Sequence, residues 1–559
     1  MVKSRRLVFT LFNVMLFCFS HSQWNSNTMI NTPIAVAANT QKNISMSSDT
    51  KKGAFIVWED KRNGTSDDIY AQRINSVGFV KWSANGVQVC TNNNEQNSIS
   101  SVEDGNGGII ITWDDYRNGE ADIYAQKIDS NGIVQWAANG VPVCSKPLSQ
   151  KGTKLVSDGA GGAIVVWQDS LLGSTDIYAQ RISNTGTLLW ASAGVPICTA
   201  PLKQIRPRIQ SDNVGGAFIV WQDRRMGVEP DIYAQRINGS GNPLWAVNGV
   251  VVCNALNSQS YPKMRSDGAN GIIVAWQDKR NALDFDIYAQ RLNASGAALW
   301  ATNGVPVAVA ADNQEELDMA TEGVTNGVII CWADHRSFIA NNSDIYVQKI
   351  DLSGNPAWTL NGIALTSSTF DQKNANIVGD GAGGAIVAWQ DSIAVSQWDV
   401  RSQKLNTNGT IQWALNGISI GNAINSQAQV GSIYDGAGGC IYAWEDKRNG
   451  IDDNIYAQHS PPLTPVGFTN EDFFAHSVKV YPTPFNSTAL LTIYNNNKKL
   501  DFESGHLRFT NLSGNEVIIR YVVSDNGYKL FKEDTPSGIY FYDLNINDQR
   551  IVGKLILGD

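Results

Sequence analysis

The sequence is poor in charge and in histidine, and each shortage excludes a class of function. Only 17% of the residues are charged, and the formal net charge is -9. Because a phosphate backbone requires a basic face, this balance argues against a nucleic-acid-binding protein. The 5 histidines, His21, His335, His459, His476 and His506, stand singly, so no zinc-ligand spacing occurs. We therefore expect no metal and no other cofactor.

Long apolar runs are also missing beyond the first residues. A basic start precedes an apolar run over residues 7–19, and a small residue follows at Ser22. This pattern predicts a signal peptide over residues 1–22 that is removed on export. A lipid-modified Cys18 is the alternative, but the large Phe17 precedes it where a small residue is needed. No later run reaches the ~18 apolar residues of a membrane-spanning helix, so no transmembrane segment is expected.

Disulfide bonds are not expected either, although the exported part keeps cysteines. The first four end the similar strings GVQVC, GVPVC, GVPIC and GVVVC, so each occupies the same place in a different repeat. Equivalent places in separate repeats do not face each other. We predict that Cys90, Cys144, Cys198 and Cys253 are buried free thiols.

What the chain does contain is a repeat. An apolar run ending in Trp-x-Asp occurs eight times at intervals of 54 to 57 residues, followed by a turn, a DIYAQRI-like segment and a segment with a second Trp. Short runs rich in Val, Ile, Tyr and Trp between Gly, Asn and Asp are typical of strands joined by tight turns. The tryptophans of the Trp-x-Asp runs are Trp58, Trp113, Trp167, Trp221, Trp276, Trp332, Trp389 and Trp444.

Each unit is predicted to hold four strands. In the fourth copy they would span Arg206–Gln210, Gly216–Gln222, Asp231–Ile237 and Asn242–Val252. Eight such units favour an all-β fold, an eight-bladed β-propeller over residues 23–460. An open solenoid is the alternative, but its ends would need atypical capping repeats.

The second tryptophan series predicts how the ring closes. It also has eight members, from Trp24 to Trp413, but it is displaced by part of a repeat. The mature chain thus starts on an outer strand, and its last repeat stops near Gln458 on a third strand. Beside that strand, the N-terminal segment would complete the last blade and remove the exposed edge. We expect a closed ring that is a monomer.

The repeated polar residues favour a structural role. Asp follows the Trp by two positions in all eight copies, and Arg follows by four in six. Eight similar turns provide eight similar environments, whereas acid–base catalysis needs one that drives two carboxyl pKa values apart. We predict that these side chains bridge the turn between the second and third strands. Calcium is the alternative, although the turns lack the Asp-x-Asp-x-Asp-Gly spacing of known loop sites.

A ligand site is therefore expected where the copies differ. The candidates are Trp398 and Arg401 in the seventh copy, and His335 and Phe338 in the longer loop of the sixth. An exposed aromatic such as Trp398 could stack on a sugar or a peptide, or pack locally. Strings such as EDKRNGTSDDIY resemble the blades of TolB-like propellers over roughly residues 24–460. That resemblance implies a fold and no single function, since such propellers serve many purposes.

The C-terminal region departs from the repeat. Residues 461–477 contain Pro, Gly and acidic residues typical of a linker, and residues 478–559 are predicted to form about seven short strands, enough for an Ig-like β-sandwich. Its distinctive positions are Tyr481, Pro482, Pro484, Phe485, Gly514, Gly538, Tyr540, Gly553 and Lys554. With these, the segment resembles the type A sorting domain of the type IX secretion system of Bacteroidota, although Thr483 stands where Asn is common.

This resemblance implies an export route. The signal peptide leads the chain through the inner membrane, and the type IX secretion machinery then recognises the C-terminal domain and exports the folded protein. In that family a sortase-like peptidase often removes the domain and can attach the cargo to surface lipopolysaccharide. The protein is therefore expected to be secreted or held on the outer cell surface.

The molecular activity has two main interpretations. No Gly-x-Ser-x-Gly elbow and no Cys/His pairing is visible, so nucleophilic catalysis has no apparatus in the sequence. This favours a non-enzymatic module that binds or adheres to an extracellular glycan or protein. The alternative is an extracellular polysaccharide hydrolase or lyase with a site in the propeller funnel. A surface-coat role is a third interpretation.

Overall fold

The computed structural model describes residues 24–460 and 476–558, except for gaps at 26, 172–173, 326, 337–341, 395–396, 482–484, 496–505, 512–515, 525–526 and 547–548. Within these residues the regular elements are all strands, and no helix is long and apolar enough to cross a membrane. They form two compact units, divided between Leu463 and Thr464. The predicted signal peptide lies outside the described residues, as does most of the predicted linker.

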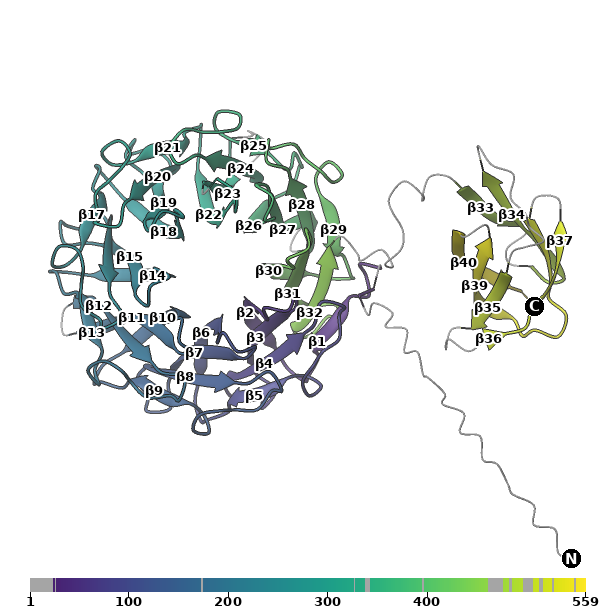
Figure 1. The fold of residues 1–559 in the computed structure, drawn as a ribbon, viewed down its shortest axis with the longest axis horizontal. Helices are drawn as coiled ribbons and strands as arrows, with labels where there is room; N and C mark the ends of the chain where they lie inside the picture. Colours follow the sequence, from purple (N-terminus) through teal and green to yellow (C-terminus); the bar gives the residue numbers. More distant parts are fainter. Residues whose placement is uncertain are drawn as a thin grey trace, which may run out of the picture. The chain divides into compact units, whose positions relative to one another are not determined.

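The first unit contains eight four-stranded antiparallel sheets among its described residues, and they are arranged around a common centre (Figure 1). This arrangement is consistent with a β-propeller. We number the sheets 1 to 8 by the order of their Trp-x-Asp runs, so that sheet 1 holds Trp58 and sheet 8 holds Trp444.

Every sheet uses its strands in the same order from the centre outwards. The first, innermost strands are β2 (Gln41–Ser48), β6 (Gln96–Glu103), β10 (Gln150–Ser157), β14 (Gln204–Ser211), β18 (Gln259–Ser266), β22 (Gln314–Thr321), β26 (Gln372–Gly379) and β30 (Gln427–Tyr434). The second strands are β3 (Ala54–Asp60), β7 (Ile109–Asp115), β11 (Ala163–Leu171), β15 (Ala217–Asp223), β19 (Ile272–Asp278), β23 (Val328–Asp334), β27 (Ala385–Ala394) and β31 (Cys440–Asp446).

The two outer strands of each sheet follow in the same way. The third strands are β4 (Asp68–Ile74), β8 (Asp122–Ile128), β12 (Ser174–Ile182), β16 (Asp231–Ile237), β20 (Asp286–Leu292), β24 (Asp344–Ile350), β28 (Gln397–Leu405) and β32 (Asn454–Ser460). The outermost strands are β5 (Val87–Cys90), β9 (Val141–Cys144), β13 (Val195–Cys198), β17 (Val250–Cys253), β21 (Val305–Ala308), β25 (Ile363–Ala364), β29 (Ile418–Gly421) and, in sheet 8, β1 (Thr32–Ala35).

The core of the ring lies between neighbouring sheets. Every residue of the second strand β15 is buried, as a strand paired on both edges and packed on both faces requires. One apolar cluster joins Ile164 and Ile177 of sheet 3 to Ile219 and Trp221 of sheet 4. Each sheet therefore buries its faces against the sheets beside it, which holds the ring together and orients the inner strands.

The outermost strands are shorter than the sequence predicts. In sheet 4 the prediction of a strand over Asn242–Val252 is wrong for most of that range, because the strand spans only Val250–Cys253. Residues 242–249 fold back on the third strand, where the Leu244 amide donates to the carbonyl of Arg236 at 2.7 Å. The Trp245 indole then donates to the carbonyl of Ala294 in sheet 5 at 2.9 Å. The second tryptophan series thus joins neighbouring sheets instead of lying on a strand.

The N-terminal segment completes sheet 8, and this prediction is confirmed. Strand β1 pairs antiparallel with β32, with Thr32 opposite Ala457 and Ala35 opposite Ile455. Trp24 is 6% exposed, and its indole donates to the carbonyl of Ser76 in sheet 1 at 2.9 Å. It therefore makes the same contact to the next sheet as the later members of its series.

The second unit has two four-stranded antiparallel sheets, with orders β33-β34-β38-β37 and β36-β35-β39-β40 among the described residues. Buried residues of both sheets, including Leu491, Tyr528, Leu544 and Leu555, share one apolar core. The strands are β33 (His476–Tyr481), β34 (Thr488–Asn495), β35 (His506–Asn511), β36 (Glu516–Val517), β37 (Arg520–Ser524), β38 (Gly527–Phe531), β39 (Gly538–Ile546) and β40 (Gln549–Leu557).

Candidate functional site

Each innermost strand carries a β-bulge at the same position. Non-glycine residues at the bulge have φ near 50–60°, a left-handed conformation that is uncommon for them. The bulge residues are Asn43, Ser98, Gly152, Arg206, Tyr261, Glu316, Asn374 and Gln429. The backbone is thus repeated in every sheet, while the side chain that it presents near the centre differs from sheet to sheet.

The bulge is fixed by the preceding sheet. The amide of Ser98 donates to a carboxylate oxygen of Glu59 at 2.9 Å, and the amide of Arg206 donates to the side-chain oxygen of Gln168 at 2.9 Å. Asn43 in sheet 1 donates in the same way to Glu445 in sheet 8, at 2.7 Å, so the contact also crosses the closure of the ring. Each acceptor directly follows the Trp of its sheet. We call these contacts the bulge staples.

Three of the bulge staples have a carboxyl acceptor, namely Glu59, Glu445 and Asp114, which accepts the amide of Gly152 at 2.8 Å, and the first two meet at Asn43. Burial raises the pKa of Glu59 and that of Glu445 from 4.5 to about 7. Asn43 lies between them, since its amide binds Glu445 and its side-chain amide donates to Glu59 at 2.7 Å. The seam between sheets 8 and 1 therefore holds two carboxyl groups that are partly protonated at neutral pH.

Replacing both groups by glutamine should stabilise the ring at alkaline pH. In the folded protein these two carboxyl groups stay protonated up to about pH 7, whereas an unperturbed carboxyl loses its proton near pH 4.5. The stability that the bound protons provide is therefore fully present below pH 4.5 and is lost as the pH rises through 7. We expect the Glu59→Gln, Glu445→Gln variant to lose less melting temperature than the parent between about pH 5 and pH 8. Glutamine already fills the same position at Gln168, so the amide acceptor is retained.

The matched control for this titration is Glu229→Gln, which removes a carboxyl from an exposed turn. Thermal melts of the three proteins across the pH range provide the comparison. Parallel pH profiles of the parent and the double variant would contradict a role for the two buried carboxyl groups.

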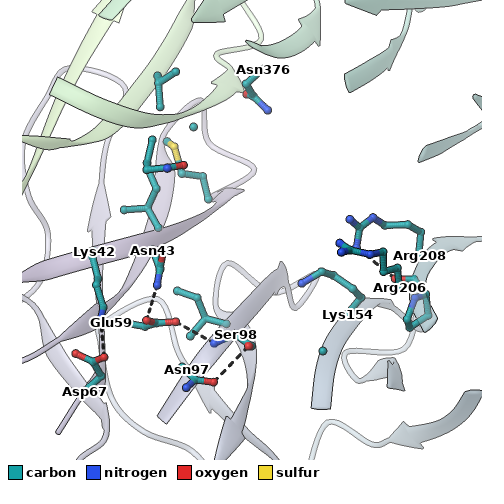
Figure 2. A pocket seen from close by; sticks show the side chains of 18 of the residues that line it. Lys42, Asn43, Glu59, Asp67, Asn97, Ser98, Lys154, Arg206, Arg208 and Asn376 are labelled. Carbon is teal, nitrogen blue, oxygen red and sulfur yellow. Dashed lines mark hydrogen bonds and ion pairs between the residues drawn. The ribbon is translucent and has the colours of Figure 1, made fainter. Parts of the chain in front are cut away.

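A polar cavity of about 1010 Å³ lies at the centre of the ring. It is lined by residues of the inner strands of sheets 1 to 4, 7 and 8, together with Glu59, Asp67, Tyr116 and Gln168. Figure 2 shows the side chains of Lys154, Arg206 and Arg208 on one side of this space and the Glu59 group on the other. We call this space the central cavity.

The basic side of the central cavity comes from consecutive sheets. Lys154 is in β10, whereas Arg206 and Arg208 are in β14. Burial, followed by repulsion from Arg208, lowers the pKa of Lys154 to about 8. Burial also lowers the pKa of Arg208. Arg206 lies over the ring of Tyr261, with 4.4 Å between the guanidinium carbon and the ring centroid.

The candidates from the sequence lie elsewhere. Trp398 is half-buried in β28, with the Lys373 ammonium 4.4 Å from its ring centroid. The guanidinium of Arg401 pairs with Asp391 at 2.6 Å, and the imidazole of His335 lies 3.3 Å from Glu315. None of these three residues lines the central cavity. Phe338 lies outside the described residues.

Arg401 has a structural explanation. Sheet 7 lacks the Arg that follows the Trp-x-Asp run by two residues in six other sheets. Arg401 instead comes from the neighbouring strand, where it replaces the usual Tyr opposite Trp389, and supplies the charge for Asp391. Its divergence therefore compensates for a missing partner. Trp398 and His335 stay as predictions.

The predicted free thiols are confirmed, whereas the predicted Asp–Arg pair forms at the start of the turn and does not span it. The six cysteines of the described residues are free and buried, and burial raises the pKa of those at the four equivalent places to about 12. In sheet 4 the guanidinium of Arg225 binds Asp223, the last residue of β15, with 2.6 Å between Nη2 and Oδ2, and it also donates to the carbonyl of Asn248 at 2.8 Å. The described residues contain no group of three or more His, Cys, Asp or Glu that could hold a metal ion.

The sorting-domain positions are described only in part. Phe485 is buried and pairs in parallel with Leu557, and the hydroxyl of Tyr540 donates to the carbonyl of Pro536 at 2.9 Å. Gly538 begins β39. Three other positions belong to strands β33 and β40, namely Tyr481, Gly553 and Lys554. Outside the described residues lie Pro482, Pro484 and Gly514.

Comparison with known proteins identifies the C-terminal part. Residues 479–558 match the family described as the secretion system C-terminal sorting domain. This domain indicates export by the type IX secretion machinery, with the protein secreted or on the cell surface. No curated protein matches the sequence.

Several solved structures share low similarity with the chain. An ulvan lyase of polysaccharide lyase family PL25 is 10% identical, with a TM-score of 0.39, and the match covers 76% of this chain and 94% of that one. The polysaccharide lyase Uly1 is 10% identical, with a TM-score of 0.39, and the match covers 67% of this chain and 91% of that one. A protein of unknown function from Dyadobacter fermentans is 10% identical, with a TM-score of 0.32, and the match covers 56% of this chain and 96% of that one. Such distant likenesses do not bear on the function of this chain.

Proposed function

We propose that the chain is an exported eight-bladed β-propeller that binds an extracellular ligand in its central cavity without chemical conversion. In this proposal residues 1–22 are the signal peptide, 23–460 the propeller, 461–477 a linker, and 478–559 an Ig-like sorting domain. The eight four-stranded sheets and the pairing of β1 with β32 support the blade count and the closure. The family match over residues 479–558 supports the sorting domain.

The binding function is supported by the positions at which the eight sheets carry different residues. The buried Trp and the Asp two residues after it recur in all eight sheets. The residues at the bulge and two positions beyond it vary from sheet to sheet, and several of them line the central cavity. A repeated scaffold with a varied polar lining is suited to recognising one ligand of irregular chemistry, such as an extracellular glycan or a protein segment.

A hydrolase or lyase is the second candidate, and one observation favours it. Glu59 lines the central cavity opposite the basic residues, and its pKa of about 7 suits a general acid or base. Against this, both of its oxygens are already bound, one to the Ser98 amide and one to the Asn43 side chain. The bulge staple explains the position of Glu59 without catalysis, so binding is the better interpretation.

A single screen separates the two functions. The mature chain would be applied to arrays of glycans and extracellular matrix proteins, and each retained polymer would then be incubated with the protein and analysed for shortened or unsaturated products. We expect retention without products. Turnover that is lost in Glu59→Gln would replace the binding function by the catalytic one, and retention that is unaffected by substitutions in the central cavity would refute the cavity as the site.

A further inference from the structure

One register position of the inner strands defines a ring of residues around the centre. It is the residue that pairs with the position directly before the Trp of the second strand. We call these the ring positions. They are occupied by Ser45, Ser100, Lys154, Arg208, Lys263, Asp318, Asn376 and Gly431.

Around much of this ring, neighbouring inner strands contact each other through side chains. The ammonium of Lys263 lies 3.1 Å from Asp318, and the side-chain amide of Asn376 donates to the same carboxylate at 3.0 Å. Ser432 then donates to the side chain of Asn376. Between sheets 1 and 2, the hydroxyls of Ser45 and Ser101 are 2.9 Å apart. These contacts satisfy the polar groups that the ring brings to the centre.

Lys154 and Arg208 interrupt this chain of contacts. Within the described residues, neither has a carboxylate at ion-pair distance. The Lys154 ammonium donates to the carbonyl of Thr153 at 3.0 Å, and the Arg208 guanidinium donates to that of Pro207 at 3.4 Å. Withdrawing a cation from water costs free energy that a neutral carbonyl offsets only in part. The lowered pKa of Lys154 is a consequence of that cost.

We propose that Lys154 and Arg208, together with Arg206, bind an anionic group carried by a saccharide, either a carboxylate or a sulfate. This inference rests on the proposed binding function of the central cavity. The guanidinium groups supply paired donors for an oxyanion, and the ammonium supplies a third charge. An anion at this place would complete the ring of polar contacts across sheets 3 and 4.

The remainder of the central cavity suits the rest of a sugar. Its volume of about 1010 Å³ is far greater than a lone oxyanion needs and matches the upper range of sites for small organic ligands. The neutral polar side chains of Asn43, Asn97, Ser98 and Gln429 also line the cavity, and Figure 2 shows the first three on the side of Glu59. Amide and hydroxyl groups both donate and accept, so they match the hydroxyls of a saccharide.

The test compares one double variant with a control of equal charge. Lys154→Gln, Arg208→Gln removes two cations from the central cavity, and Lys81→Gln, Lys447→Gln removes two exposed ones that do not line it. Binding to the mature chain would be measured by calorimetry with four probes: oligogalacturonate, its neutral methyl ester, a sulfated galactan oligosaccharide and sodium sulfate. The first double variant should melt no lower than the parent, because it removes two cations that repel each other and have no ion-pair partner among the described residues.

We expect the parent to bind at least one of the two acidic oligosaccharides, the cavity variant to lose about 10–100-fold in affinity, and the control variant to keep it. Equal losses in both variants would overturn the inference, since they would show an unspecific effect of net charge. Competition by sulfate that is as strong as that of the oligosaccharides would also overturn it, because the ligand would then be a free oxyanion.

Failure of the inference can be told from failure of the proposed function. If a neutral oligosaccharide binds the parent and the cavity variant equally, and Asn97→Leu weakens it, the central cavity is a saccharide site and the anionic ligand class is wrong. If no saccharide or protein binds in a way that any cavity substitution changes, the proposed function itself is refuted.

Discussion

A chain that begins at residue 36 should melt about 5–10 °C below the mature protein. The truncation removes β1, the outermost strand of sheet 8, and with it the buried side chains of Trp24 and Ile34. Loss of a buried Trp side chain alone costs about 3–5 kcal/mol. The third strand β32 is then left as an exposed edge, which also favours aggregation.

Polar contacts add to this loss. The Gln458 side chain donates to the carbonyl of Asn25 at 2.7 Å, and the Arg448 guanidinium donates to that of Ile30 at 2.7 Å. Both groups would lose a partner in the truncated protein. Sheet 8 would then meet sheet 1 only through its three remaining strands, where the bulge staple of Asn43 has its acceptor, so that the destabilisation should spread to β2.

Two point variants make this prediction specific. Trp24→Ala should cost as much as Trp82→Ala, because both indoles donate to a carbonyl of the next sheet, at 2.9 Å and 3.2 Å. Met29→Ala, at a side chain that is 57% exposed, should leave the melting temperature unchanged. A peptide of residues 24–35 added to the truncated protein should restore part of the loss by strand addition. A truncated protein that melts like the mature one would rule out closure by β1.

The repeat explains why much of the fold was predictable. Trp221 and its equivalents mark the buried second strands, and the offset of Trp24 from that series indicates the closure. The length of the outermost strand was not predictable in the same way. Trp245 donates to a carbonyl of the following sheet, and a contact between sheets leaves no trace in the local alternation of residues.

The central cavity was missed for a related reason. The sequence candidates lie in the sixth and seventh copies because the repeated motif is interrupted there. For Arg401 the interruption has a structural cause, since this residue replaces the missing Arg as the partner of Asp391. The first strands hold the informative differences, yet their bulge places residues such as Arg206 in a left-handed conformation that side-chain alternation does not indicate. A position-by-position comparison of the eight first strands would have revealed that three consecutive sheets carry a basic residue at one position, namely Lys154, Arg208 and Lys263.

The Asp of the Trp-x-Asp motif should contribute strongly to stability, and Asp223 of sheet 4 shows why. This residue is fully buried, and its carboxylate accepts the Trp221 indole at 2.7 Å and the Arg225 guanidinium at 2.9 and 2.6 Å. The guanidinium carbon lies 3.8 Å from the ring centroid of Tyr233. One carboxylate thus orients an indole, a guanidinium and the turn that follows.

Asp223→Ala should lower the free energy of unfolding by about 3–5 kcal/mol, because it leaves a largely buried guanidinium without its counter-charge and a buried indole N–H without an acceptor. Asp223→Asn should cost less, since it keeps one oxygen acceptor for the indole. Urea titrations followed by tryptophan fluorescence, with hydrogen exchange to locate the weakened sheet, would measure both.

Sheet 3 provides the matched control. Its Asp169 pairs with Lys146 at 2.6 Å, and the Trp167 indole has no hydrogen-bond partner within the described residues. Asp169→Ala therefore removes one ion pair and orphans no indole, and it should cost about 1–3 kcal/mol. If Asp169→Ala proves as costly as Asp223→Ala, the indole contact contributes little, and the recurrence of Trp-x-Asp would need an explanation other than the stability of each sheet.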